Sequence, residues 1–242
     1  EFIEKCAHEL HTKRASDRNG LSVEHVVHAH PIVYIHLKRL FQLIMQHGHV
    51  PLDFKTGVIV PIVKDNKKGV DNVDNYRPIT IISVLSKIFE MCLYKTIGGY
   101  LKVGGLQYGF FKGGGCDKSI FTVQNVVNHY IKRKSSVYVV TLDASAAFDR
   151  VIVYALMSKL IDRNVPAGIM RVLLSWYSVS HACVRLDGIT TDNIDICSGV
   201  KQGGIMSPQL YNVYVDELMT KLLNENLGCT IGGHAYSAVI YA

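Results

Sequence analysis

The stretch "VYVVTLDASAAFDRV", residues 137–151, decides how the rest of the sequence is interpreted. Its run of apolar and β-branched side chains predicts a buried strand, and the strand leads into a bare carboxylate, Asp143. Burying a lone carboxylate costs roughly several kcal/mol unless a cation meets it. A hard cation such as Mg²⁺ would satisfy Asp143, and the small residues that follow leave room for a ligand. A helix cap or a turn residue at the strand end is the alternative, and Asp149 fits that alternative better because a helical pattern follows it.

The composition is that of a folded globular protein with a basic middle third. The 242 residues are 48% hydrophobic and 19% charged, with a net charge of +6. Between Pro61 and Lys134, twelve Lys and Arg stand against five Asp and Glu, so this segment alone carries +7. Such a concentration favours a polyanionic partner, nucleic acid or nucleotide phosphates, with a solvated basic face as the alternative.

The cysteines and the apolar runs predict a soluble intracellular protein. Six cysteines are scattered without a C-x-x-C pair, which is typical of reduced thiols. No signal peptide opens the chain, and no apolar run approaches the roughly 18 residues of a membrane span. The sequence begins without Met inside an amphipathic pattern, so we expect a fragment of a longer protein.

Helical and strand patterns alternate irregularly along the chain, which favours the α+β class over a doubly wound sheet. The stretch 65–80 is predicted to be a loop, and the strand before it contains Pro61, which favours an edge or bulged strand. Asp187-Gly188 predicts a hairpin turn. We expect helices near residues 1–12, 22–47, 83–101, 118–134, 152–161, 166–177 and 208–226, and strands near 56–64, 137–143, 181–197 and 229–242.

Two further stretches carry candidate binding residues. Lys64 and Arg77 flank a basic loop and could both reach phosphate oxygens, or they could be ordinary surface charges. In "SGVKQGGIMSP", residues 198–208, Gly203 allows close backbone approach and Gln202 offers both a donor and an acceptor. An ordinary helix-entry turn is the alternative for this loop.

The order of these motifs resembles the reverse transcriptase domain of non-LTR (LINE-type) retrotransposons. The resemblance covers nearly the whole chain, through "DNYRPITIISVLSKIFE", "LQYGFFKGGGCDKSIFTVQNVV", "DASAAFD" and "GVKQGGIMSPQLYNVYVDEL". It implies an α+β right-hand polymerase fold with fingers and palm and without a thumb. The implied domains are a helical N-terminal extension at 1–50, fingers at 51–136 and an incomplete palm at 137–242.

The resemblance also implies roles for individual residues. Asp143 resembles the first catalytic aspartate, which holds two Mg²⁺ ions (Mn²⁺ is the alternative) together with the Ala144 carbonyl. Phe148, beside Ala147 in the implied nucleotide site, matches the aromatic gate that excludes a 2′-hydroxyl, although a core Phe is the alternative. The resemblance implies that Lys64 and Arg77 hold the triphosphate. It also implies that Gln202 and Gly203 lie near the nascent base pair.

The sequence departs from the family pattern in two places. Ala146 stands where the family usually has Lys, which puts substrate binding in doubt. The family's next motif is Tyr-Ala-Asp-Asp, and this sequence stops at Tyr241-Ala242, so we expect the carboxylates that share the metals with Asp143 to lie outside it. The expected function is therefore that of a fragment of an RNA-directed DNA polymerase. The alternative is a catalytically silent remnant that at most binds nucleic acid.

The expected partners are an RNA template, a DNA primer and deoxynucleoside triphosphates, with no membrane, in the cytoplasm or nucleus. Two rival interpretations are weak. A P-loop on "GGGCDKS" fails because Cys116 and Asp117 separate the glycines from Lys118. A zinc module fits eight of the eleven histidines within residues 1–49, among them His25 and His28, but their spacing lacks Cys partners.

Overall fold

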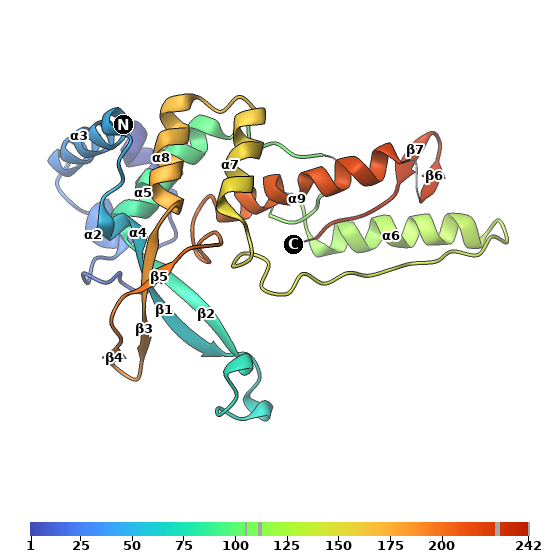
Figure 1. Ribbon diagram of the computed structural model, residues 1–242, viewed down its shortest axis with the longest axis horizontal. Helices are drawn as coiled ribbons and strands as arrows, with labels where there is room; N and C mark the ends of the chain where they lie inside the picture. Colours follow the sequence, from blue (N-terminus) through green and yellow to red (C-terminus); the bar gives the residue numbers. More distant parts are fainter. Residues whose placement is uncertain (105, 111–112, 226–227, 242) are drawn as a thin grey trace. The chain divides into compact units, whose positions relative to one another are not determined.

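The computed structural model describes residues 1–104, 106–110, 113–225 and 228–241, which form two compact units (Figure 1). Unit 1 comprises residues 1–100 and 148–207, and unit 2 comprises residues 101–147 and 208–242. The chain therefore passes between the units three times. The stretch 137–151 is divided, because its residues up to Ala147 belong to unit 2 and those from Phe148 belong to unit 1. These boundaries differ from the predicted ones after residues 50 and 136, and the division into fingers and palm stays a prediction.

The core of unit 1 is built by helices around an aromatic cluster. Phe89 stacks on Trp176 with ring centroids 5.4 Å apart and packs against Phe41 at 4.9 Å. Large rings bury much apolar area, so this cluster joins helices that are distant in sequence. The helices of the unit are α1 (Phe2–His8), α2 (Val23–Val27), α3 (Ile32–His47), α4 (Leu52–Lys55), α5 (Val84–Ile97), α7 (Val153–Asp162) and α8 (Ala167–Tyr177).

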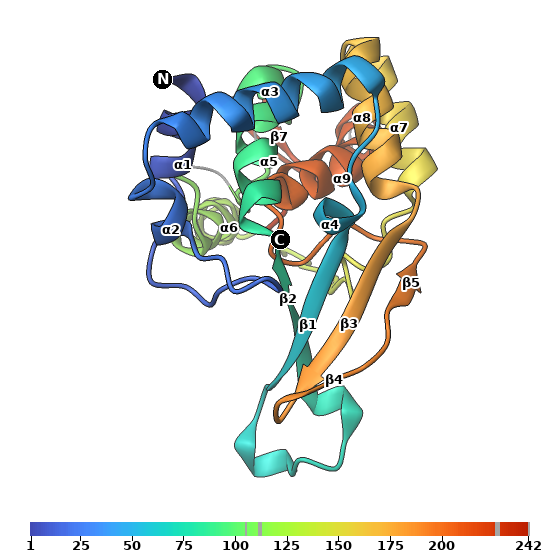
Figure 2. The ribbon, with the colours of Figure 1, turned by 90° about the vertical axis from the view of Figure 1, so that its left-hand side faces the viewer.

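Unit 1 also holds a mixed sheet in which β1 runs between β2 and β3 (Figure 2). β1 pairs with β2 in antiparallel fashion and with β3 in parallel fashion, and β3 pairs with β4 and β5. Asp187 and Gly188, both at positive φ, form the predicted turn between β3 and β4. The strands are β1 (Thr56–Val63), β2 (Tyr76–Ile82), β3 (Ser180–Leu186), β4 (Ile189–Thr190) and β5 (Ile194–Ile196).

The prediction that Pro61 marks an edge or bulged strand is wrong, because β1 is flanked on both sides. The pairing with β3 extends only as far as Ile59, whereas the pairing with β2 continues past Pro61. Pro61 therefore has a paired strand on one side alone, and there it lies opposite Pro78. A residue without an N–H is tolerated where no second strand needs its donor.

The predicted loop at 65–80 is wrong in its second half. Two short 3₁₀ turns, η1 (Asn66–Lys68) and η2 (Val73–Asn75), form the tip of the hairpin, and β2 begins at Tyr76. Arg77 therefore lies in a strand and not in a loop, paired with Ile62. The local sequence misleads because Pro78 is a strand breaker in most settings, but here its partner is also a proline.

Unit 2 contains two long helices, α6 (Cys116–Ile131) and α9 (Ser207–Asn224, whose first residue belongs to unit 1), and a small hairpin of β6 (Cys229–Ile231) and β7 (His234–Tyr236). A buried amide pair holds the loop before α6 against α9. The side chain of Gln107 donates to Asn212 Oδ1 at 2.9 Å, and Asn212 donates to the Gly109 carbonyl at 3.0 Å. The Ile240 N–H donates to the Leu106 carbonyl at 3.0 Å.

The predicted buried strand at 137–143 is wrong. The segment is an extended coil that pairs with none of the described strands, and Figure 1 draws it as a long trace after α6. Its apolar side chains face solvent, with exposed fractions of 92% for Tyr138, 82% for Val140 and 91% for Leu142. A strand needs a neighbour for its backbone groups and a layer for its side chains, and within the described chain this segment has neither.

Candidate functional site

A cavity of about 370 Å³ in unit 1 is lined by polar side chains that include Asp149, Lys201 and Gln202. One wall is the sheet face that carries Gly57 and Ile59 of β1 and Pro78 and Thr80 of β2. The opposite wall is the loop between β5 and α9, which contributes the run of residues 197–202. The cavity therefore forms where the "SGVKQGG" motif lies against the sheet.

Residues 148–151, in the second half of the stretch 137–151, are hydrogen-bonded to this loop. The N–H groups of Gly199 and Val200 donate to the carbonyls of Val151 and Phe148, at 2.8 and 2.9 Å. The Ser198 hydroxyl donates to the Asp149 carbonyl at 3.2 Å. A Cβ on Gly199 would stand 2.8 Å from the Phe148 carbonyl oxygen, so only glycine permits this approach. Two motifs about fifty residues apart are thus held in a fixed register.

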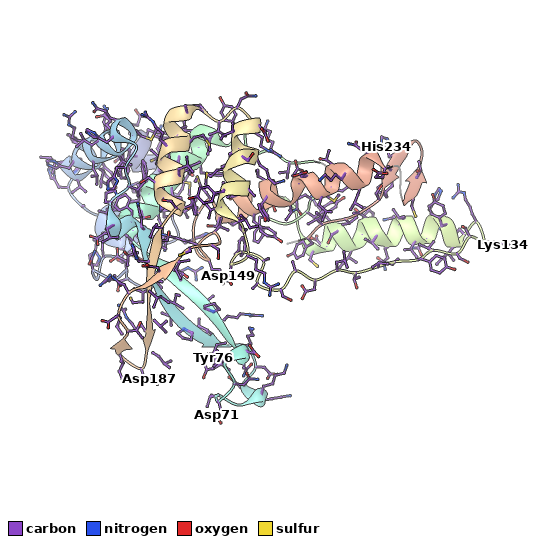
Figure 3. The ribbon with its side chains drawn as sticks, viewed as in Figure 1. Asp71, Tyr76, Lys134, Asp149, Asp187 and His234 are labelled. Atoms are coloured by element: carbon purple, nitrogen blue, oxygen red, sulfur yellow. The ribbon has the colours of Figure 1, made fainter. Side chains whose placement is uncertain are left out.

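Asp149 faces the loop with its side chain and not only with its backbone. The Gln202 side-chain amide donates to both carboxylate oxygens of Asp149, each at 3.1 Å, and both residues line the cavity. The interpretation of Asp149 as a helix cap is wrong, because α7 has Ile152 at its N-cap and no side-chain cap. In Figure 3, Asp149 lies near the helical end of the sheet, whereas Asp71 marks the distant hairpin tip.

The next residues of the loop are fixed by β2 and α5. Gly203 has a φ of +104°, and a Cβ there would stand 2.5 Å from the Thr80 carbonyl oxygen. A Cβ on Gly204 would approach Glu90 Oε1 to 3.0 Å. Both glycines therefore serve close packing at a left-handed or crowded position. The prediction that Gly203 allows close backbone approach agrees with this geometry, with β2 as the approaching backbone.

A buried carboxylate on α5 ties the end of the loop. Glu90 is 3% exposed and accepts from the N–H of Ile205 at 2.8 Å and from that of Met206 at 3.2 Å, just before α9. Burial raises the pKa of the Glu90 carboxyl, while these two N–H groups and the ammonium groups of Lys201 and Lys87 act in the opposite direction. Sequence reasoning missed Glu90, and a charged residue on the apolar stripe of a helix was the available signal.

Lys201 completes this buried polar cluster. Its ammonium donates to the carbonyls of Phe54 at 3.1 Å and Lys55 at 2.8 Å. Burial lowers the pKa of Lys201 to about 8, against the attraction of Glu90, which raises it. The loop is thus fixed at its start by residues 148–151, in its middle by Thr80, and at its end by Glu90 and Lys201.

A histidine–carboxylate pair lines the same cavity. His181 of β3 and Asp195 of β5 are direct cross-strand partners, and His181 Nδ1 lies 2.8 Å from Asp195 Oδ1. Sequence reasoning missed this pair. The two residues meet because β3 and β5 pair in a particular register, and no motif spacing in the sequence reveals that register.

Lys64 and Arg77 share one face of the β1–β2 hairpin. Arg77 lies between Tyr76 and Pro78 on a strand, so alternation directs it away from the face that carries Pro78 and Thr80 and lines the cavity. Lys64 follows β1 two residues after the partner of Arg77, which places it on the same face, and its ammonium donates to the Asp74 carbonyl at 2.8 Å. Neither Lys64 nor Arg77 is among the residues that line the Gln202 cavity.

The remaining predicted residues fall on both sides of the unit boundary. Phe148 is half-buried in unit 1, next to Asp149. Asp143 and Ala144 are exposed in unit 2, and Ala147 is half-buried there. The structure therefore groups Phe148, Gln202 and Gly203 within one unit and leaves Asp143, Ala144 and Ala147 in the other.

The sequence was compared with protein families and with curated proteins. Residues 64–242 match the family model described as reverse transcriptase (RNA-dependent DNA polymerase). The chain belongs to the reverse transcriptase family. The resemblance to the reverse transcriptases of non-LTR retrotransposons is thereby confirmed, because the similar proteins include R2 and jockey elements.

Three relatives illustrate the extent of the match. The chain is 28% identical over 98% of its length to the retrovirus-related Pol polyprotein from the type-1 retrotransposable element R2 of Popillia japonica. It is 27% identical over 84% of its length to the Pol polyprotein from the type-2 element R2DM of Drosophila melanogaster, and 29% identical over 76% to the RNA-directed DNA polymerase from the mobile element jockey of that species. The chain spans 33%, 19% and 20% of these relatives' own lengths.

Reverse transcriptases generally use divalent metal ions, so we tested the fit of the described residues to such an ion. Asp143 and the neighbouring Ala144 carbonyl are oxygen donors of the kind that Mg²⁺ prefers. Among the described residues, no group of three or more His, Cys, Asp or Glu side chains could hold a metal. The donor chemistry fits a hard cation, and the described residues supply only part of a ligand set.

The structure also bears on the two rival interpretations, a zinc module and a P-loop. His25 accepts a hydrogen bond from the Ser22 N–H at 2.9 Å, so it takes the N3 place in a capping box at the start of α2. The glycines before α6 follow no described strand, which a P-loop requires. No helix in the described part of the chain has the length and apolar character needed to cross a membrane.

Proposed function

We propose that this chain forms the fingers and palm of an RNA-directed DNA polymerase from a non-LTR retrotransposon. The observation that carries the proposal is the set of hydrogen bonds between residues 148–151 and 198–202. These bonds join two family motifs at one cavity. Family membership supplies the reaction class, template-directed nucleotidyl transfer. The substrates in this proposal are deoxynucleoside triphosphates, an RNA template and a DNA primer, and the compartment is intracellular, in the cytoplasm or nucleus.

The roles that we propose for individual residues are those that the family resemblance implies. We assign Gln202 and Gly203 to the neighbourhood of the incoming nucleotide, and Phe148 and Ala147 to its sugar, with Phe148 as the gate against a 2′-hydroxyl. Lys64 and Arg77 share one hairpin face, where a point charge and a guanidinium fork suit triphosphate oxygens. The +7 charge of residues 61–134 favours contact with the nucleic-acid backbone.

Mg²⁺ is the ion that we assign to the reaction, held in part by Asp143 and the Ala144 carbonyl. When bound, such an ion stabilises charge on the transferring phosphate and lowers the pKa of the attacking hydroxyl. The solvent exposure of Asp143 leaves its carboxylate open to an ion and to substrate phosphates.

The second candidate function is a catalytically silent domain that binds nucleic acid. The partial ligand set of the described residues favours it, because one carboxylate supplies too few oxygen ligands for two metal ions. Both candidates predict salt-sensitive binding of RNA, so binding alone does not separate them.

Primer extension on an RNA template separates the two candidates. The assay compares the 242-residue chain with a longer protein, of the length of the relatives, that carries the same chain. We expect Mg²⁺-dependent DNA synthesis by the longer protein, negligible synthesis by the chain alone, and complete loss in Asp143→Asn. Asp192→Asn, an exposed carboxylate in the loop between β4 and β5, is the matched control and should retain activity. Synthesis by Asp143→Asn at the parent rate would overturn the assignment, and no synthesis by the longer protein would favour the silent domain.

A further inference from the structure

We propose that Asp149 is a positioning residue that fixes the side-chain amide of Gln202, so that Gln202 presents its carbonyl oxygen as an acceptor to the nucleotide. This inference rests on the proposed function for the identity of the ligand. The contact itself rests on geometry within unit 1.

The carboxylate of Asp149 determines how the Gln202 amide is oriented. An ionised carboxylate only accepts hydrogen bonds, whereas the end of a glutamine side chain has one donating and one accepting group. Both oxygens of Asp149 lie 3.1 Å from Gln202 Nε2. The amino group must therefore face Asp149, and the carbonyl oxygen faces away from it. A ligand group that reaches the Gln202 carbonyl oxygen must then be a donor, a hydroxyl or an amino group.

The backbone around Asp149 is rigid enough for this role. Its own carbonyl accepts from the Ser198 hydroxyl, and the carbonyls of Phe148 and Val151 accept from the loop. Gly199 lies so close to the Asp149 Cα that an added Cβ would stand 2.9 Å away. Asp149 and Gln202 therefore approach each other from two backbones that are already joined, which reduces the entropy cost of their contact.

The cationic and histidine side chains near Asp149 and Gln202 bind other groups. The Lys201 ammonium donates to the Phe54 and Lys55 carbonyls. His181, on the cavity wall, faces Asp195. Lys201 and His181 therefore have partners other than Asp149 and Gln202.

The exposure of Asp149 distinguishes positioning from structural support. An exposed hydrogen bond adds little to stability because water competes for both partners. Removing Asp149 should thus leave the melting temperature of the chain nearly unchanged while freeing the Gln202 amide to rotate.

The first arm of the test uses the 242-residue chain itself. In ¹⁵N-labelled protein, the Gln202 side-chain amide should give two separated proton signals with slow solvent exchange, assigned by their absence in Gln202→Met. Asp149→Ala should shift both signals towards those of a solvent-exposed glutamine amide and accelerate exchange, and Asp195→Ala, which removes the other carboxylate of the cavity wall, should not. An amide in the parent that exchanges as fast as in Asp149→Ala would overturn the inference.

The second arm uses primer extension by the longer protein. We expect Asp149→Ala and Gln202→Ala each to raise the KM for the nucleotide about tenfold, with the double variant no worse than either, because both remove one contact. Asp149→Glu, which keeps the acceptor, should recover part of the loss. A normal KM in Asp149→Ala beside a raised KM in Gln202→Ala would overturn the positioning role. A parent without any synthesis would instead overturn the proposed function, and the first arm would still decide the contact.

Discussion

The two halves of the stretch 137–151 behave in opposite ways. Residues 137–143 are apolar and rich in β-branched side chains, yet they are exposed coil, with Val140 at 82% exposure. Residues 148–151 are more polar, yet they are fixed by hydrogen bonds to the 198–202 loop, and Val151 is fully buried at 0% exposure. A segment of strand-forming composition becomes a strand only where a second segment hydrogen-bonds to its backbone.

The same contrast explains where the candidate site is strongest. The 198–206 loop has no regular secondary structure, but three separate parts of unit 1 hold it in place. Residues 137–143, which carry Asp143, have no comparable support among the described residues. Binding groups that must keep a fixed geometry are therefore better supported around Gln202 than around Asp143.

The largest expected effect is at Glu90, which accepts hydrogen bonds from the end of the 198–206 loop. Glu90→Ala removes the acceptor of two buried N–H groups and leaves Lys201 without its nearby opposite charge. We expect a loss of about 3–5 kcal/mol in the free energy of unfolding, measured by urea with Trp176 fluorescence as the probe of unit 1. Asp162→Ala, an exposed carboxylate at the end of α7, should cost less than about 0.5 kcal/mol. Equal losses in the two variants would mean that Glu90 does not hold the loop.

A pair of valines tests the comparison directly. Val151→Ala creates a cavity in unit 1 and should cost about 1–3 kcal/mol, whereas Val140→Ala removes an exposed methyl pair and should cost less than about 0.5 kcal/mol. Urea unfolding followed by circular dichroism measures both variants. A large loss in Val140→Ala would show that residues 137–143 are buried in solution, and the contrast drawn here would then be wrong.

A third expected effect is the pH dependence that Lys201 gives to unit 1. The pKa of Lys201 is lowered to about 8 by burial, from 10.5 in the unfolded chain. Between these values the unfolded state binds more protons, so this group makes stability rise as the pH increases from about 8 to 10.5. The difference in unfolding free energy between the parent and Lys201→Met should change with pH across that window.

The control for this titration is Lys221→Met, on the exposed side of α9. Its unfolding free energy should run parallel to that of the parent between pH 8 and 10.5. A difference between parent and Lys201→Met that stays constant with pH would mean that the Lys201 ammonium is not desolvated.

Most helices followed from the sequence, because their apolar residues recur at a spacing that one face of a helix can bury. Ser22 and Pro31 are the N-cap residues of α2 and α3, and Gly48 ends α3 in the left-handed conformation. The strands were harder. β2 was missed because Pro78 depends on its partner Pro61, and the strand at 137–143 was predicted because its composition alone suggests one. Both errors concern pairing, which a local pattern does not contain.

The sequence by itself determined the family, the α+β class and the order of the motifs, since these depend on residue types and spacings along the chain. Only the tertiary structure decided that Asp149 contacts Gln202, that Glu90 fixes the end of the loop, and that Lys64 and Arg77 share one hairpin face. The physical reason is that hydrogen bonding, burial and strand register depend on which distant segments meet. Those meetings arise from packing of the whole chain and not from the residues beside each group.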